Sequence, residues 1–166
     1  MDLQGKVHKF GNDVNTDYII SGRHKFKTLD MKELARHVME DLDPDFYAKV
    51  EPGDFIVGGT NFGCGSSREQ APLAILNANI SAVIAKSFAR IFYRNCINTG
   101  LPLVECDTDS IDEGDELKVD LSGGVLHNLT KGTDIPITPL PSVMLKILNA
   151  GGLVEHFKKH GGFNFD

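Results

Sequence analysis

The sequence is poor in cysteine, has no long apolar run and carries no excess of basic residues. Its three cysteines are an odd number in a chain of 166 residues without an export signal, so we expect free thiols. No apolar run approaches the roughly 20 residues needed to span a bilayer. The first ten residues, MDLQGKVHKF, lack the apolar region of a secretory signal. These absences predict a cytoplasmic protein without disulfides or a membrane span.

The charge balance disfavours nucleic acid as a partner. The formal net charge is −6 and the isoelectric point is near 5.5, whereas nonspecific nucleic-acid binding requires a basic face that displaces counterions. The densest positive cluster, Arg23-His24-Lys25-Phe26-Lys27, is either a solvated turn or a small anion-recognition loop. A hydrophobic fraction of 41% and a charged fraction of 24% are typical of a globular protein, and the length fits one domain over residues 1–166.

The order of the expected elements indicates an α/β fold. Between residues 54 and 105, three apolar strands alternate with two helices, which implies parallel strands joined by right-handed crossovers. We expect strands at 5–10, 14–20, 54–58, 80–85, 101–105, 117–121 and 125–129. We expect helices after Asp30, which fits a capping box with Glu33, from near Glu69, over 87–99, and from a Ser142 cap to a break at Gly151-Gly152. The expected architecture is a mixed-sheet α/β core with β-rich flanks.

The segment GTNFGCGSSREQ, residues 59–70, joins an expected strand to an expected helix and concentrates polar chemistry. It lacks the Lys-Ser/Thr pair of a Walker loop and the third glycine of a dinucleotide-binding loop. A glycine-rich turn still presents backbone N–H groups and the positive end of a helix dipole to an anion. This property suits a carboxylate as well as a phosphate, so both remain open at this turn.

The cysteines are expected to be packing residues. Cys64 would act as a nucleophile only beside a base, and none of the six histidines is close to it in the sequence. The spacings of Cys64, Cys96 and Cys106 do not match a zinc or iron–sulfur ligand run. We therefore expect no metal site in this chain.

Ser66 is either a helix cap or a group that faces a ligand. The run SSRE fits the S-x-x-E capping box, but Pro72 would then lie beyond the first turn and clash with the carbonyl of Arg68. A helix that begins near Glu69 avoids the clash and leaves Ser66 and Ser67 in the preceding loop. Two hydroxyls, free amides and a guanidinium can bind a carboxylate and handle a proton. Because no second catalytic partner is local, we expect the other half of the site on a different polypeptide.

Four stretches together carry a family resemblance. They are NTDYIISG at 15–22, GTNFGCGSSREQAP at 59–72, AVIAKSFARIFYRNCINTGLPLV at 82–104 and DEGDELKVDL at 112–121. In this order they resemble the small subunits of 3-isopropylmalate dehydratase, which are similar to the swivelling domain of aconitase. The resemblance implies a β/β/α swivelling domain and a separate large subunit with a [4Fe–4S] cluster, whose free iron binds the substrate hydroxyl and carboxylate. It also implies a reaction that moves a hydroxyl between adjacent carbons by dehydration and rehydration.

The same resemblance implies roles for individual residues. It implies that Ser66 is the base that removes the carbon-bound proton, that Ser67 contributes its amide to the anion pocket, and that Arg68 binds a substrate carboxylate. Asp17 matches an aspartate on the active-site side. Arg23 is expected to contact the distal group of the substrate, and His24 or Lys25 is the alternative for this contact. The loop that sets specificity is expected to comprise Ser21, Gly22, Arg23, His24 and Lys25.

Several functions remain as alternatives. The leading one is the small subunit of a hydro-lyase that interconverts 2-isopropylmalate and 3-isopropylmalate in leucine biosynthesis. An arginine at position 23 could instead favour a third carboxylate, as in homoaconitase, and a methyl- or dimethylmalate dehydratase of the citramalate type is a further alternative. From a different class, the loop could belong to a stand-alone module that binds carboxylates. RNA binding is disfavoured by the charge balance.

Overall fold

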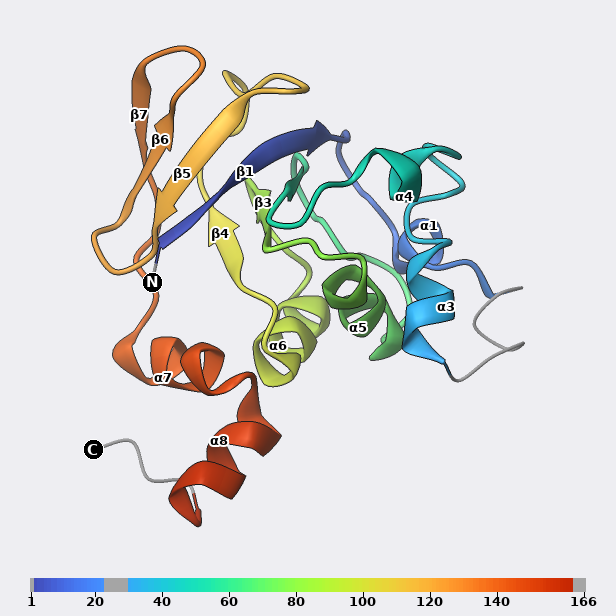
Figure 1. Cartoon of the computed structure of the whole chain (residues 1–166), viewed down its shortest axis with the longest axis vertical. Helices are drawn as coiled ribbons and strands as arrows, with labels where there is room; N and C mark the ends of the chain where they lie inside the picture. Colours follow the sequence, from blue (N-terminus) through green and yellow to red (C-terminus); the bar gives the residue numbers. More distant parts are fainter. Residues whose placement is uncertain (1, 23–29, 163–166) are drawn as a thin grey trace.

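The computed structural model describes residues 2–22 and 30–162, and seven strands within them form one sheet (Figure 1). The strands are β1 (Asp2–Lys9), β2 (Phe55–Val57), β3 (Ala82–Ala85), β4 (Leu103–Glu105), β5 (Glu116–Asp120), β6 (Val125–Asn128) and β7 (Thr133–Pro136). Their order across the sheet is β4-β3-β2-β1-β5-β6-β7. Strands β2 to β4 pair in parallel and are called the parallel half, whereas β5 to β7 pair antiparallel and are called the antiparallel half.

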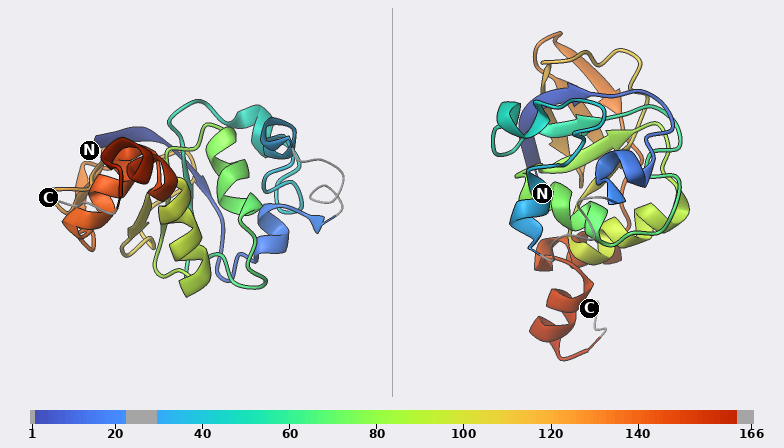
Figure 2. Two further views of the ribbon diagram at one scale, coloured as in Figure 1. Left: turned by 90° about the horizontal axis from the view of Figure 1, so that it is seen from below. Right: turned by 90° about the vertical axis from the view of Figure 1, so that its right-hand side faces the viewer.

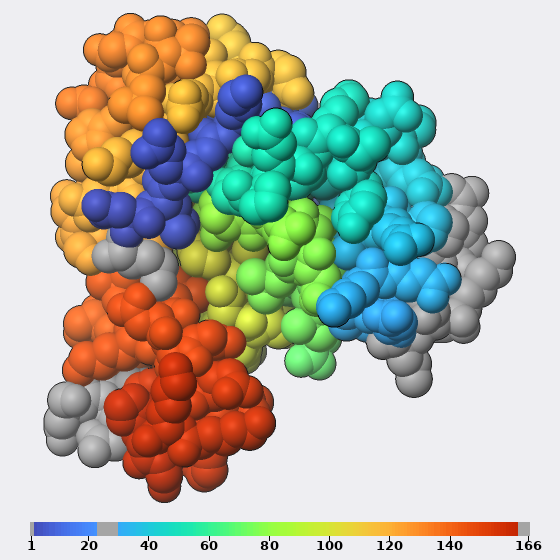
Figure 3. All heavy atoms as spheres, in the orientation of Figure 1, coloured from blue at the N-terminus to red at the C-terminus, as the bar shows by residue number. Residues whose placement is uncertain are grey.

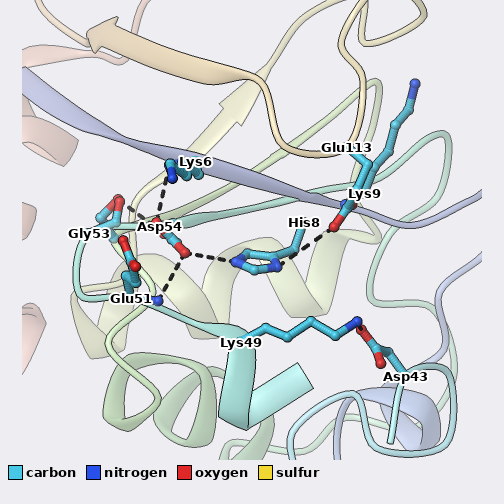
Figure 4. A network of polar contacts seen from close by, with 10 residues as sticks. Lys6, His8, Lys9, Asp43, Lys49, Glu51, Gly53, Asp54 and Glu113 are labelled. Atoms are coloured by element: carbon cyan, nitrogen blue, oxygen red, sulfur yellow. Dashed lines mark hydrogen bonds and ion pairs between the residues drawn. The ribbon is translucent and has the colours of Figure 1, made fainter. Parts of the chain in front are cut away.

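Strand β1 joins the two halves of the sheet. Its first part pairs antiparallel with β5, and its last three residues pair in parallel with β2. Where β1 changes partner, the buried Asp54 accepts hydrogen bonds from the backbone N–H groups of Lys6 and Glu51 and lies 2.8 Å from Nε2 of His8 (Figure 4). The His8 ring packs edge-on against Phe46, with ring centroids 5.2 Å apart. This buried network ties β1 to β2 and to the helix that contains Phe46.

The helices cover the parallel half of the sheet or pack on one another. They are α1 (Thr16–Ile19), α3 (Met31–Ala35), α4 (Phe46–Lys49), α5 (Gln70–Asn77), α6 (Arg90–Thr99), α7 (Ser142–Ala150) and α8 (Leu153–His160), of which α7 and α8 pack against α6 and each other. Seen from below, α5 and α6 lie side by side, and α7 and α8 adjoin α6 on the side away from α5 (Figure 2). None of the helices in the two described ranges combines the length and the apolar character needed to cross a membrane.

Side chains of the parallel strands alternate between two apolar cores. Ile56 and Val83 face the core formed with α1, α3, α5 and α6, whereas Val57 and Ile84 face the core shared with the antiparallel half. Successive residues of a strand point to opposite faces, so a strand that is covered on both faces is apolar throughout. This double burial explains the continuous apolar runs that predict β2 and β3.

Most expected elements are confirmed. The three strands expected between residues 54 and 105 are β2, β3 and β4, and the intervening helices are α5 and α6. Gly100 ends α6 with a φ angle of +91°, in the left-handed region that glycine favours. Asp30 caps α3 by accepting a hydrogen bond from the N–H of Lys32. The hairpin expected over 117–129 is formed by β5 and β6.

Two expectations about local structure are wrong, and one strand was missed. Residues 14–20, expected as a strand, contain helix α1, because the Asn15 side chain caps it by accepting a hydrogen bond from the N–H of Asp17 at 2.8 Å. Ser142 is the first residue of α7 and does not cap it, since the cap position is Pro141. Strand β7 carries no clear sequence pattern because Ile135 is its one buried residue.

Candidate active site

Three chain segments meet beyond the carboxyl ends of the parallel strands β1, β2 and β3. They are residues 10–16 after β1, residues 58–69 after β2 and residues 86–89 after β3. The carboxyl ends of neighbouring parallel strands lie at one edge of the sheet, where open α/β sheets bind ligands. The segment GTNFGCGSSREQ therefore lies at the edge where a site is expected.

Hydrogen bonds join the first two of these segments. The N–H of Gly63 donates to the carbonyl of Val14 at 2.7 Å, and the N–H of Thr16 donates to the carbonyl of Cys64 at 2.8 Å. The hydroxyl of the buried Thr16 donates to the carbonyl of Ser66 at 2.9 Å. Ser66 is thus fixed through its backbone while its side chain stays exposed.

The third segment is joined to the loop in the same way. The N–H of Phe62 donates to the carbonyl of Ser87 at 3.0 Å, and the N–H of Ala89 donates to the carbonyl of Phe62 at 2.9 Å. The ring of the buried Phe62 packs against Phe88 and Phe92. The loop after β2 is therefore held on both sides, by the segment before α1 and by the segment before α6.

Gly63 and Gly65 allow the loop to pass close to its neighbours. Their φ angles are +84° and +95°, which lie in the left-handed region that favours glycine. A Cβ atom on Gly63 would lie 2.1 Å from Cγ of Phe92, and one on Gly65 would lie 2.6 Å from Oδ1 of Asn15. Close packing therefore accounts for these glycines without a bound phosphate.

The loop enters α5 as the position of Pro72 predicts. Glu69 is the N-cap of α5, so Pro72 lies in the first turn, where its missing N–H removes no helical hydrogen bond. Ser66 and Ser67 precede the helix, are exposed and do not cap it. The amide of Asn95 in α6 donates to Oγ of Ser67 at 3.3 Å, whereas the Ser66 hydroxyl has no hydrogen-bond partner among residues 2–22 and 30–162.

Arg68 and Asp17, which are far apart in the sequence, form an ion pair. Nη1 of Arg68 lies 2.6 Å from Oδ1 of Asp17, and the side chains are 16% and 55% exposed. The buried Nη1 makes no hydrogen bond of good geometry within the described part of the chain, so this contact is an ion pair alone. Because Asp17 is largely exposed, the pair contributes at most about 1 kcal/mol to stability. Its main effect is to hold the guanidinium beside the serine loop.

A pocket of about 210 Å³ opens between the loop and the first turns of α6. It is lined by Thr16, by residues within 63–68, and by α6 side chains that include Arg90, Ile91 and Asn95. Its volume is below the roughly 300–1,000 Å³ of a pocket that encloses a drug-sized ligand. The pocket is therefore too small to enclose such a ligand on its own.

Sequence reasoning missed three polar residues that line this pocket, Thr16, Arg90 and Asn95. The hydroxyl of Thr16 donates a hydrogen bond to the carbonyl of Ser66, which is 50 positions later in the sequence. No local sequence pattern predicts such a contact. Asn95 has one signal, because it is a polar residue in phase with the apolar positions of the helix expected over 87–99.

Only part of the expected specificity loop can be located. Ser21 and Gly22 follow α1 and are half-buried. Arg23, His24 and Lys25 lie outside the described residues, so their contact with a substrate stays a prediction.

The cysteines are not arranged for catalysis. Cys96 is fully buried in α6, and burial raises the pKa of its thiol well above the ordinary value. Cys106 is half-buried, and its burial, together with the charge of Asp107, raises the pKa of its thiol to about 12. Cys64 is half-buried, and its thiol has no hydrogen-bond partner in the part of the chain that the structure covers. Over those same residues, no group of three or more His, Cys, Asp or Glu side chains is placed to hold a metal ion.

Comparison with known proteins agrees with this geometry. Residues 15–108, which contain all three converging segments except the start of the first, match the model of the aconitase C-terminal domain family. The chain is 62% identical over 161 residues to a 3-isopropylmalate dehydratase small subunit 2 of Archaeoglobus fulgidus, covering 97% of this chain and 98% of the relative. It is 56% identical over 156 residues to a 3-isopropylmalate dehydratase small subunit of Wolinella succinogenes, covering 93% of each chain.

A solved structure shares the whole fold. The crystal structure of a 3-isopropylmalate dehydratase chain from Methanocaldococcus jannaschii superimposes with a TM-score of 0.93 at 49% identity, covering 97% of this chain and 96% of that chain. The chain therefore belongs to the aconitase C-terminal domain family, whose swivelling-domain fold it has. Within that family, its relatives of high identity and full-length coverage are small subunits of 3-isopropylmalate dehydratase.

Proposed function

We propose that this chain is the small subunit of a hydro-lyase that interconverts 2-isopropylmalate and 3-isopropylmalate by dehydration and rehydration. The observation that carries the proposal is the Ser66-Ser67-Arg68 run, in which both serines are exposed, fixed by Thr16 and Asp17 at the carboxyl ends of the parallel strands. The names and the full-length identity of the relatives support the substrate, since the matched chains are small subunits of 3-isopropylmalate dehydratase.

Ser66 acts as the base on the substrate carbon. Ser66 lines the pocket, and its side-chain oxygen has no competing partner among the described residues, so as an alkoxide it can accept the carbon-bound proton during dehydration and become a hydroxyl. The same hydroxyl returns the proton during rehydration in the opposite direction. A serine is present as an alkoxide base only where positive charge and oriented dipoles stabilise its anionic form, and Arg68 with the start of α5 provides that setting.

Arg68 and Ser67 bind a substrate carboxylate. The planar guanidinium matches the two oxygens of a carboxylate, and Asp17 restricts its orientation. Ser67 supplies an exposed backbone N–H to the same anion, while its hydroxyl is oriented by Asn95. Arg23 contacts the distal group of the substrate, with Ser21, Gly22, His24 and Lys25 forming the rest of the specificity loop.

The second half of the site belongs to a large subunit. The pocket is small, and its residues supply a base and hydrogen-bond donors for a carboxylate but no group that activates the departing hydroxyl. Such a large subunit would hold a [4Fe–4S] cluster, which supplies Lewis-acid chemistry when bound. The donors that line the pocket are hydroxyls, amides and guanidinium groups, which suit a substrate carboxylate and not an iron ion. We infer that the cluster ligands all lie on the partner.

Reconstitution tests the proposal. Neither this chain alone nor the cognate large subunit alone is expected to turn over 3-isopropylmalate, whereas their mixture is. In the mixture, Arg68→Lys should raise KM roughly tenfold or more, because a lysine cannot bind a carboxylate bidentately. Full activity of either subunit alone, or an unchanged KM in the variant, would contradict the proposal.

Two comparisons test the alternatives. Turnover of homoaconitate, a methylmalate or a dimethylmalate in preference to 3-isopropylmalate would reassign the substrate within the same chemistry, and Arg23→Ala would identify the residue responsible. Calorimetry of the isolated chain with small di- and tricarboxylates addresses a stand-alone binding module. The half-site proposal predicts no tight binding without the large subunit, and micromolar binding would favour the module.

A further inference from the structure

A second, apolar hollow lies on the other side of α6 from the serine loop. The groove between α6 and α7 has a volume of about 350 Å³, and its apolar lining includes Tyr93, Ile97, Val143 and Met144. Val143 is 40% exposed, although it lies on a helix whose later residues Ile147 and Leu148 are buried. In the ribbon and space-filling views, α7 and α8 form a lobe that extends beyond the sheet (Figures 1 and 3). The groove thus lies at the junction of this lobe with the body.

The groove is continuous with the mouth of the candidate active site. Arg90, the first residue of α6, lines both the groove and the pocket. Successive residues of an α-helix are rotated by about 100° around its axis. Arg90 and Arg94, which line the groove, therefore lie on a face of α6 next to the face of Ile91 and Asn95, which line the pocket. Ile91 is 53% exposed at the pocket rim. A body that covers the pocket over Ile91 would therefore extend directly over the groove.

The groove also carries positive charge that no described residue neutralises. Arg90 and Arg94 are exposed, and no carboxylate within residues 2–22 and 30–162 forms an ion pair with either guanidinium. Exposed lysines elsewhere are of both kinds, since Lys49 lies 2.8 Å from Asp43 and Lys131 lies 2.7 Å from Asp112, whereas Lys6, Lys118 and Lys159 form no ion pair with a described residue. What distinguishes the two arginines is their position beside the apolar groove. The chain has a net charge of −6, yet two arginines without ion-pair partners among the described residues lie beside an apolar groove. Such a surface is suited to bind a partner that presents an apolar side chain with carboxylates next to it.

We propose that the large subunit docks in this groove as well as over the pocket, inserting an apolar side chain between α6 and α7 and pairing carboxylates with Arg90 and Arg94. The proposal rests on the proposed function, because that function supplies the large subunit as the occupant. Apolar anchors in a pocket and arginines at its edge are the contacts that dominate protein interfaces. The groove then fixes the small subunit relative to the large one, and with it α6, whose Asn95 contacts Ser67 beside Ser66.

The test is the dissociation constant between the full-length chain and the purified large subunit, measured without substrate. Val143→Asp places a charge in the groove and should weaken binding by at least about tenfold. Arg94→Glu should weaken binding by a similar factor at low salt and by less at high salt, where surface charges are screened. Leu129→Asp is the matched control, since Leu129 is 48% exposed at the turn between β6 and β7, which Figure 1 shows at the opposite end of the hairpin from α7.

The possible results separate this proposal from the proposed function. Wild-type affinity in both Val143→Asp and Arg94→Glu overturns the docking groove and leaves the proposed function intact. Equal weakening by Leu129→Asp also overturns it, because the effect would not be local. If Val143→Asp does not fold, as judged by its thermal unfolding, Arg94→Glu alone decides. Failure of the wild-type chain to bind the large subunit overturns the proposed function together with the groove.

Discussion

The two halves of the sheet share β1, yet their polar groups are used differently. In the antiparallel half, polar groups pair with one another, as where the buried Asn128 donates to Asp115 at 2.9 Å and Lys131 lies 3.7 Å from the same carboxylate. In the parallel half, the Ser66 hydroxyl has no partner among the described residues, and Arg68 has one ion pair. In hairpins, neighbouring polar groups form hydrogen bonds and ion pairs with one another. The loops that follow parallel strands converge at one edge of the sheet, where some of their polar groups remain available to a ligand. The location of the site follows from this difference in topology.

The largest predicted difference in stability between the halves concerns the replacement of two glycines that have the same backbone conformation. Gly63 and Gly114 have φ angles of +84° and +83°, but a Cβ atom would meet Phe92 at the first position and nothing within 4 Å at the second. Gly114→Ala should therefore lower the free energy of unfolding by about 1–2 kcal/mol from backbone strain alone. Gly63→Ala should lower it by about 3 kcal/mol or more, because overpacking adds to the strain. Urea unfolding measures both, and equal losses would contradict the close packing assigned to the loop.

A second pair of variants separates stability from activity. Thr16 and Thr108 are both buried and donate their hydroxyls to backbone carbonyls, of Ser66 at 2.9 Å and of Gly58 at 2.8 Å. Each change to valine should lower the free energy of unfolding by about 1–3 kcal/mol. Only Thr16→Val should also lower the kcat of the reconstituted enzyme, by roughly tenfold with little change in KM, because it releases the backbone of the base.

The conservative variant completes this test. Thr16→Ser retains the hydroxyl and should recover most of the kcat. An equal fall of kcat in Thr108→Val, or no recovery in Thr16→Ser, would contradict a positioning role for Thr16.

The parallel half could be predicted from sequence because its signals are local. Strands β2 and β3 are apolar throughout, Gly100 stops α6, and Pro72 fixes where α5 can begin, so neighbouring residues decide each element. The run 14–20 misled because its β-branched residues favour a strand, whereas the Asn15 cap and the burial of Ile19 and Ile20 impose a helix.

The candidate site could be predicted only in part. The serine loop carries its own signature, so Ser66, Ser67 and Arg68 were accessible from sequence. Asp17 was assigned to the active-site side from a family resemblance, but its ion pair with Arg68 was not predicted, and the contact of Thr16 with Ser66 spans 50 residues. Such contacts depend on which strands are neighbours, and a single sequence does not specify their distances.

A third, smaller contrast concerns two exposed ion pairs. Asp17 pairs with Arg68 at 2.6 Å, and Asp112 pairs with Lys131 at 2.7 Å, with side chains 55% and 68% exposed for the two aspartates. Asp17→Asn and Asp112→Asn should each lower the free energy of unfolding by less than about 1 kcal/mol. Only Asp17→Asn should raise the KM of the reconstituted enzyme, by roughly fivefold, since it frees the guanidinium that binds the carboxylate. A similar KM in both variants would contradict the role of the pair.

The smallest predicted effect is a pH dependence that belongs to the antiparallel half. Burial acts to raise the pKa of Asp115, but hydrogen bonds from the Asp112 N–H and the Asn128 amide and the charge of Lys131 outweigh it, and the pKa lies below its ordinary value of 3.8. A lowered pKa in the folded state contributes stability that is present above 3.8 and is lost as the pH falls through the folded-state pKa.

Denaturant unfolding at a series of acidic pH values measures this contribution. The wild-type free energy of unfolding should fall with pH in that window, and Asp115→Asn should show a shallower fall because it has no carboxyl group to protonate. Parallel curves for the two proteins would contradict the assignment.

The central claim is that Ser66 moves the carbon-bound proton, and the kcat of the reconstituted Ser66→Ala enzyme tests it most directly. Ser110→Ala is the matched control, an exposed serine in the loop before β5 and outside the pocket. The account predicts that Ser66→Ala lowers kcat by roughly 10²–10⁴-fold, the usual contribution of a positioned acid–base group, while Ser110→Ala leaves kcat unchanged. A Ser66→Ala enzyme that retains the kcat of the wild type would contradict the account.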